Sequence, residues 1–167
     1  MDEVLTQFRK PTTFNGPLEA GLRAVAILGS AHPRSFDLQR LVAFDYLLVH
    51  TGDIGGPSSL HPPTPLQSAE LLVRRRLIDR ALLLMMTRDL VERDFVADGI
   101  CYRAGENASP FLSSLASDYL RELKKRAAWL VKELGDKDEA AFRAVMRRFF
   151  EKWVEEFQAA ELSLGAE

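Results

Sequence analysis

The 167-residue sequence contains a single cysteine, Cys101. One thiol cannot form a disulfide within the chain, and there is no pair of thiols with which to build a zinc site. Both absences are typical of a protein that works in a reducing compartment. Because Cys101 falls on a predicted strand next to Tyr102, we interpret it as a small buried side chain rather than a reactive thiol.

The sequence also lacks an excess of one charge and a long apolar run. Its 22 basic and 24 acidic side chains leave a net charge of −2, so any contact with nucleic acid has to come from a local patch. The longest apolar stretch, Ala81–Met86, is far shorter than the roughly 20 residues that cross a bilayer. Residues 1–10 lack the basic start and apolar core of a secretory signal. We therefore expect a cytoplasmic protein that does not contact a membrane.

Apolar residues at helical spacing predict three helices in the first part of the chain. The first begins at Pro17, a residue suited to a first helical turn, and stops before Pro33. The second is capped by Ser35 or Asp37 and ends near Gly52. The third extends from about Ser68 to Arg88.

The spacing of apolar residues then changes from that of a helix to that of β-strands. An Asp-Gly pair, Asp98-Gly99, separates two β-prone runs and predicts strands near 91–96 and 99–104. Helix, helix, basic helix and hairpin in this order are typical of a winged-helix domain.

Helical spacing returns after the hairpin. A short helix can start at Asn107 or Ser109, a longer one ends at Gly135, and a last one carries an apolar stripe over 142–157. Their tight connection predicts an antiparallel helical hairpin.

Together these patterns predict a mainly α protein with a small β-hairpin. We divide it into an N-terminal tail (1–13), a winged-helix-like domain (14–106) and a C-terminal helical extension (107–167) packed on the same core.

The run from Gly52 to Pro65 is rich in glycine, proline and serine and is longer than a typical connection, which favours a role in binding. Nucleophilic catalysis could draw on His50 and His61 with the nearby serines, but no nucleophile elbow or phosphate-binding loop motif occurs. A metal site could use the same histidines with Asp45 and Asp53, although their spacing matches no established ligand pattern. We favour a third interpretation, in which the histidines and Asp53 brace the loop through hydrogen bonds. We predict no catalytic residue, cofactor or metal ion.

A cluster of arginines in and after the third predicted helix is the best candidate for nucleic-acid contact. It consists of Arg74, Arg75, Arg76, Arg80, Arg88 and Arg93. A winged helix can present such residues to a groove and to phosphates. The alternative, which we favour, is a solvated helix face with ion pairs to Glu70, Asp79, Asp89 and Glu92.

The last helix carries a closely spaced set of aromatic residues that includes Phe149 and Trp153. Such a stripe most often belongs to the core of its own domain. Aromatic anchors of this kind also dominate protein interfaces, so we expect part of it to contact another subunit.

Six short motifs together resemble the middle component of bacterial ABC-three-component systems. They are FNGPLE at 14–19, DLQRLV at 37–42, HTGD at 50–53, GGP at 55–57, SLHPPTP at 59–65 and ELLVRR at 70–75. The resemblance spans about residues 14–134.

The resemblance implies a small subunit of an antiviral defence operon of the Lamassu kind, encoded between an SMC-like or RecN-like ABC ATPase and an effector, often a nuclease. It implies no catalytic residues. The first functional hypothesis is therefore an adaptor that joins the ATPase to the effector and helps to restrain the effector. Its expected partner-binding residues are His50, Asp53, Gly55, Gly56, Pro57, Leu60, His61, Pro62, Phe149 and Trp153.

Two other hypotheses stay open at this point. One is a winged-helix regulator that binds DNA through the arginine cluster. The other is an enzyme that depends on His50 and His61.

Overall fold

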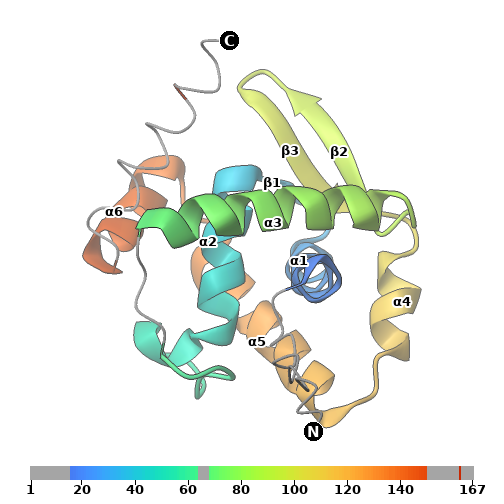
Figure 1. The fold of residues 1–167 in the computed structure, drawn as a ribbon, viewed down its shortest axis with the longest axis horizontal. Coiled ribbons are helices and arrows are strands. Elements are labelled where there is room, and N and C mark those ends of the chain that lie inside the picture. Colours follow the sequence, from blue (N-terminus) through green and yellow to red (C-terminus); the bar gives the residue numbers. More distant parts are fainter. Residues whose placement is uncertain (1–15, 64–67, 150–161, 163–167) are drawn as a thin grey trace, which may run out of the picture.

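The computed structural model describes residues 16–63, 68–149 and 162 of the chain. These residues form a mainly helical body with a small antiparallel sheet (Figure 1). The prediction of a mainly α protein with a small β-hairpin is therefore confirmed. The N-terminal tail predicted for 1–13 lies outside the described residues.

Three helices precede the hairpin, as predicted. They are α1 (Pro17–Ala31), α2 (Leu38–Val49) and α3 (Ser68–Met86). Asp37, and not Ser35, caps α2, because its carboxylate accepts a hydrogen bond of 2.7 Å from the backbone N–H of Arg40. The prediction that α2 ends near Gly52 is slightly too long, since the chain turns into a short 3-10 helix, η1 (Thr51–Ile54).

The hairpin strands are β2 (Val91–Val96) and β3 (Gly99–Ala104), as the Asp-Gly pair predicts. Gly99 takes a positive φ of 132°, which a residue with a side chain rarely adopts. A two-residue strand, β1 (Phe36–Asp37), pairs with β3 and extends the sheet to the order β1-β3-β2. The sequence did not predict this third strand, because so short a segment has no period of its own.

Helix α1 is the centre of the fold. Its side chains are buried on most sides, and it packs against α3 and α5 most extensively, with further contacts to α2, α4 and β3. Figure 1 shows α1 nearly end-on below α3, with the hairpin extending above α3. Leu18, in the first turn of α1, is an exception because 57% of it stays exposed.

The C-terminal part contains α4 (Ala108–Ser114), α5 (Asp118–Leu134) and α6 (Glu139–Phe149). Buried residues of α5 and α6 share one hydrophobic cluster with α1, α2 and α3. The ring of Phe142 in α6 packs edge-on against Phe44 in α2, with 5.6 Å between ring centroids. The antiparallel hairpin expected for the last two helices stays a prediction, because much of the last predicted helix lies outside the described residues.

The winged-helix interpretation also stays a prediction. The order α1, β1, α2, α3, β2, β3 is compatible with it. The connection between α2 and α3 is much longer than the tight turn of a helix-turn-helix motif. In the described part of the chain, no helix is both long and apolar enough to cross a membrane.

Candidate functional site

The predicted binding loop is described up to Pro63, and this part closes on itself, whereas residues 64–65 lie outside the described residues. Its two ends meet at Val49, whose carbonyl oxygen accepts hydrogen bonds of 3.1 Å from the backbone N–H groups of both Leu60 and His61. Within the loop, the Thr51 hydroxyl donates to the Pro57 carbonyl at 2.7 Å, and the Gly52 N–H donates to Ser59 Oγ at 3.0 Å. We refer to residues 50–63 as the closed loop. Hydrogen bonds between its own groups thus hold part of its backbone.

Helix α5 holds the closed loop against the body of the protein. The Arg126 guanidinium, only 6% exposed, donates to the Ser58 carbonyl from Nε at 2.9 Å and from a terminal nitrogen at 2.7 Å. The Trp129 ring lies so close to Gly56 that a β-carbon at that position would collide with it. Among the predicted partner-binding residues, Gly56 is thus fixed by packing, while Asp53, Gly55, Pro57 and Pro62 form an exposed rim.

The two histidines of the closed loop lie in internal contacts. His50 is 2% exposed and packs on the ring of Tyr46, with 4.3 Å between ring centroids. His61 lies edge-on to His50, and its Nε2 is 2.9 Å from the Tyr119 hydroxyl. The Asp53 side chain is exposed at the rim, and its backbone N–H donates to the His50 carbonyl. These contacts fit the interpretation in which His50 and His61 brace the loop.

Burial lowers the pKa of both imidazoles. For His50, Arg74 lowers the pKa further, whereas Asp53 and Asp45 oppose the shift. For His61, Arg23, His50 and Arg74 add to the effect of burial, and Asp45 opposes it. Both rings are therefore neutral in the folded protein near pH 7.

Acidification is expected to destabilise the fold through these two rings. Because their folded-state pKa values lie below the ordinary value of about 6.5, the unfolded chain takes up protons first. The two neutral rings therefore make their full contribution to the free energy of unfolding above about pH 6.5. This contribution is lost as the pH falls through and below this value. Urea unfolding at about pH 7.5 and about pH 5 measures the loss.

The matched variant for this prediction is His50→Gln/His61→Gln, which removes both titrating rings and keeps polar side chains. It is expected to lose less stability between the two pH values than the wild-type protein. An equal loss in both proteins would assign the pH dependence to other groups.

A buried ion cluster lies beneath the closed loop. Asp45, 1% exposed, accepts a hydrogen bond of 2.6 Å from Arg23, which is itself 3% exposed. Its second oxygen accepts from Arg74, so the carboxylate joins α1, α2 and α3. Two guanidinium groups thus pair with Asp45, one of the two carboxylates considered above as metal-binding partners of the loop histidines. In the described ranges, no group of three or more His, Cys, Asp and Glu side chains is placed to hold a metal ion.

The predicted arginine cluster is divided in the structure. Arg74 turns inward to Asp45 and lies over the Tyr46 ring, and Arg75 is half-buried. The exposed members are Arg76, Arg80, Arg88 and Arg93. Of the carboxylates expected to pair with this cluster, Glu92 instead pairs with Arg103 at 2.7 Å. The other ion pairs of a solvated face stay a prediction. The side chain of Glu70 lies outside the described ones.

The aromatic side chains expected to contact a partner are not among the described ones. Trp153 lies outside the described residues, and Phe149 ends α6 with a side chain that is likewise not described. Cys101 is half-buried on β3, where burial and the charge of Asp37 raise the pKa of its thiol.

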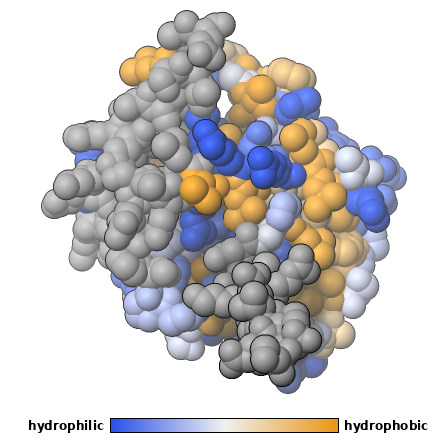
Figure 2. All heavy atoms as spheres, viewed as in Figure 1, coloured by the Kyte–Doolittle hydropathy of each residue, from blue (hydrophilic) through white to orange (hydrophobic). Residues whose placement is uncertain are grey.

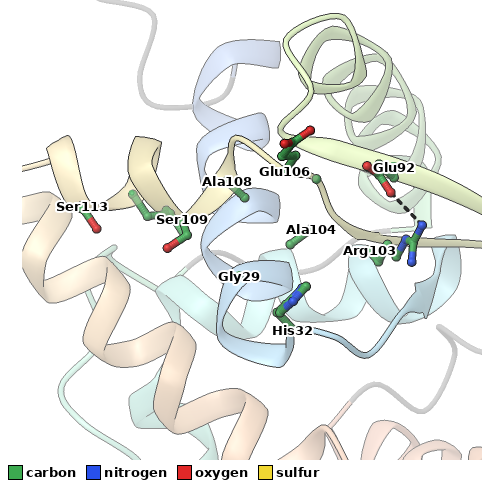
Figure 3. A pocket seen from close by; sticks show the side chains of 11 residues that line it. Gly29, His32, Glu92, Arg103, Ala104, Glu106, Ala108, Ser109 and Ser113 are labelled. Atoms are coloured by element: carbon green, nitrogen blue, oxygen red, sulfur yellow. Dashed lines mark ion pairs between the residues drawn. The ribbon is translucent and has the colours of Figure 1, made fainter.

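A cavity of about 540 Å³ lies away from all of these residues, between the end of α1, the base of the hairpin and α4 (Figure 3). The Glu92–Arg103 ion pair and His32 lie on one side of it, and Ser109 and Ser113 lie on the other. None of the predicted site residues lines this cavity. Its polar groups come from separate elements and do not converge on one point (Figure 3).

Arg23 and Arg126 were not predicted from the sequence, and Asp45 was considered for a metal site rather than for an ion pair. Arg23 and Arg126 each interrupt the buried side of an amphipathic helix, and Asp45 does so in α2. Charged residues rarely occupy such positions unless they are paired, so this interruption was an available signal. The partners lie far away in the chain, and only the fold could identify them.

Comparisons with known proteins identify one family. A family model described as ABC-three component (ABC-3C) system Middle Component 2 matches residues 13–156. No curated protein and no solved structure matches the chain.

Proposed function

The chain belongs to the middle component 2 family of ABC-three-component systems, and from this premise we propose that it is a non-catalytic adaptor. In this proposal it acts in the cytoplasm and joins an SMC-like or RecN-like ABC ATPase to an effector such as a nuclease. It also helps to keep the effector inactive, as in defence systems of the Lamassu kind. The family membership itself entails partner components in the same three-component system.

The closed loop is the observation that best supports the adaptor role. Its base is fixed to α5 through Arg126 and to α2 through Val49, while its rim is exposed. A surface that is ordered before binding loses little conformational entropy when a partner docks. His50 and His61 are engaged beneath this rim, so the loop offers a shape to a partner rather than reactive groups.

Co-expression with the two neighbouring gene products tests the proposal. The tagged chain is expected to retain a large ABC ATPase and an effector through affinity capture and size exclusion. Replacing Asp53 at the rim by lysine is expected to lower the recovered partner about tenfold, the effect of losing a charge-assisted contact and gaining a repulsive one.

Glu133→Lys, a charge reversal at an exposed position of α5, provides the matched control and is expected to leave recovery unchanged. Recovery of neither partner by the wild-type chain would contradict the adaptor role. Equal recovery by the two variants would remove the closed loop from the interface.

A second candidate function is a DNA-binding regulator with a winged-helix-like arrangement. The observation in its favour is that Arg76, Arg80 and Arg88 are exposed and pair with no carboxylate among the described residues. This function predicts an affinity for duplex DNA that falls steeply as salt rises. Arg76→Glu/Arg80→Glu should then abolish binding.

A further inference from the structure

One side of α3 combines exposed apolar and cationic residues. Val73 is 66% exposed and Leu83 is 48% exposed, and Arg76 and Arg80 lie between them. Steps of three and four residues place these four side chains on one side of the helix. The opposite side of α3 enters the core through Ile78, Ala81, Leu82 and Met85. The exposed stripe is therefore a solvent-facing side of a firmly packed helix.

The hairpin continues an apolar face beyond the core. On β2 and β3, Val91, Tyr102 and Ala104 are buried. Because side chains alternate along a strand, Arg93 and Phe95 lie on the same face, farther toward the tip. There Phe95 is 77% exposed. Ile100, directly opposite Phe95 in the register, is 42% exposed.

These two surfaces adjoin each other. Helix α3 contacts β2. After burial, the charge of Asp79 in α3 also raises the pKa of Tyr102 in β3. Figure 1 shows α3 passing in front of the base of the hairpin, and Figure 2 shows hydrophobic and hydrophilic side chains interleaved over the same face. We define the α3–hairpin corner by six of these residues, Val73, Arg76, Arg80, Leu83, Arg93 and Phe95.

The positive charge of the α3–hairpin corner favours an acidic partner. Arg76 and Arg80 have no carboxylate partner in the described part of the chain. Arg93 is held by Tyr102 and by the Phe95 ring, whose centroid lies 5.7 Å from its guanidinium carbon. A protein partner with acidic residues would supply the missing counter-charges. Arginine and aromatic side chains together are also typical of protein interfaces.

The apolar members of the corner argue against nucleic acid as its occupant. Contacts with DNA go mainly to phosphate and sugar, where exposed Val73, Leu83 and Phe95 would gain nothing. An apolar helix face would instead remove all three from water. The stripe from Val73 to Leu83 extends about 15 Å, which matches about three turns of a partner helix. We propose that the α3–hairpin corner binds an acidic amphipathic helix of a partner protein, an inference that deepens the proposed adaptor function by naming the kind of segment that docks.

The test uses the full chain and a designed probe. The probe is a fluorescent helical peptide with leucine at every third or fourth position and glutamate at the flanking positions. A scrambled peptide of the same composition is its control. The wild-type chain is expected to bind the patterned peptide at least about tenfold more tightly than the scrambled one, because only the patterned peptide has a continuous apolar face.

Two double variants separate the apolar and the charged contributions of the corner to peptide binding. Leu83→Ser/Phe95→Ser and Arg76→Glu/Arg80→Glu are each expected to weaken binding of the patterned peptide about tenfold or more. The controls, Leu18→Ser and Lys132→Glu/Arg147→Glu, change exposed residues on other elements and should bind as the wild type does. Because every replaced residue is exposed or lies at the surface of its element, all four variants are expected to fold.

The same variants are then compared in co-expression with the two neighbouring gene products. The corner variants should recover about tenfold less of one partner than the controls recover. Failure of the wild-type chain to recover any partner, with patterned-peptide binding intact, contradicts the adaptor function and supports the corner. Equal peptide binding by Leu83→Ser/Phe95→Ser and the wild type overturns the corner. Duplex DNA binding that depends on the arginines and ignores Leu83 and Phe95 overturns it as well.

Discussion

Replacing Asp45 with alanine is expected to lower the free energy of unfolding by about 3–5 kcal/mol. The Asp45 carboxylate is the shared partner of Arg23 and Arg74, and Arg23 is almost completely buried. Removing it leaves a guanidinium charge in the interior without its counter-charge. Breaking one side of a buried ion pair costs far more than the intact pair contributes, because the remaining charge is neither hydrated nor neutralised.

Urea unfolding monitored by circular dichroism measures this loss. Asp45→Asn keeps the volume of the side chain and removes only its charge, so a loss close to that of alanine would assign the effect to the charge. The control Asp53→Ala changes an exposed carboxylate nearby and should stay within about 0.5 kcal/mol of the wild type. An Asp45→Ala protein as stable as this control would show that the buried ion cluster contributes little.

The second large effect is expected at Arg126. Replacing it with alanine removes both hydrogen bonds to the Ser58 carbonyl and the ion pair with Glu122. Hydrogen bonds that involve a charged group contribute about 1.5–3 kcal/mol, so we expect a loss of about 2 kcal/mol. The loss should be concentrated in the closed loop, whose backbone amides would exchange hydrogen faster than those of the core helices.

Hydrogen exchange of the Arg126→Ala protein, read by mass spectrometry over 50–63, checks this expectation. The control is Arg121→Ala in the same helix, since Arg121 is exposed and pairs with Asp118 one turn away. Such exposed pairs contribute little, and the change should be within about 0.5 kcal/mol. If the two variants exchange alike in the closed loop, the loop is held by its own hydrogen bonds and by Trp129.

The elements that could be predicted from the sequence are those whose signal is local. Pro17 marks the start of α1, and Asp98-Gly99 marks the turn of the hairpin. Each of these signals acts within a few residues, because proline has a fixed φ angle and glycine readily adopts a positive one. Strand β1 has no such signal, because it exists only through its pairing with β3.

The candidate site was less predictable because its contacts join distant parts of the chain. The loop could be recognised from its glycines and prolines, but its attachment to Arg126 depends on how α5 packs against the body. Likewise, Arg74 could not be separated from its neighbours in the arginine cluster until the fold brought it to Asp45. The exposure of Phe95 could not be predicted either, since this residue lies in a β-prone run whose apolar side chains normally face a core.

The central position of α1 has a consequence for how the protein is made. During synthesis α1 leaves the ribosome early, but α5, one of its two main neighbours, follows only after residues 118–134 have been translated. Until then, the apolar sides of α1 face water or a chaperone. Native packing must therefore wait for most of the nascent chain, and a premature stop before α5 would leave a product prone to aggregation rather than a smaller working subunit.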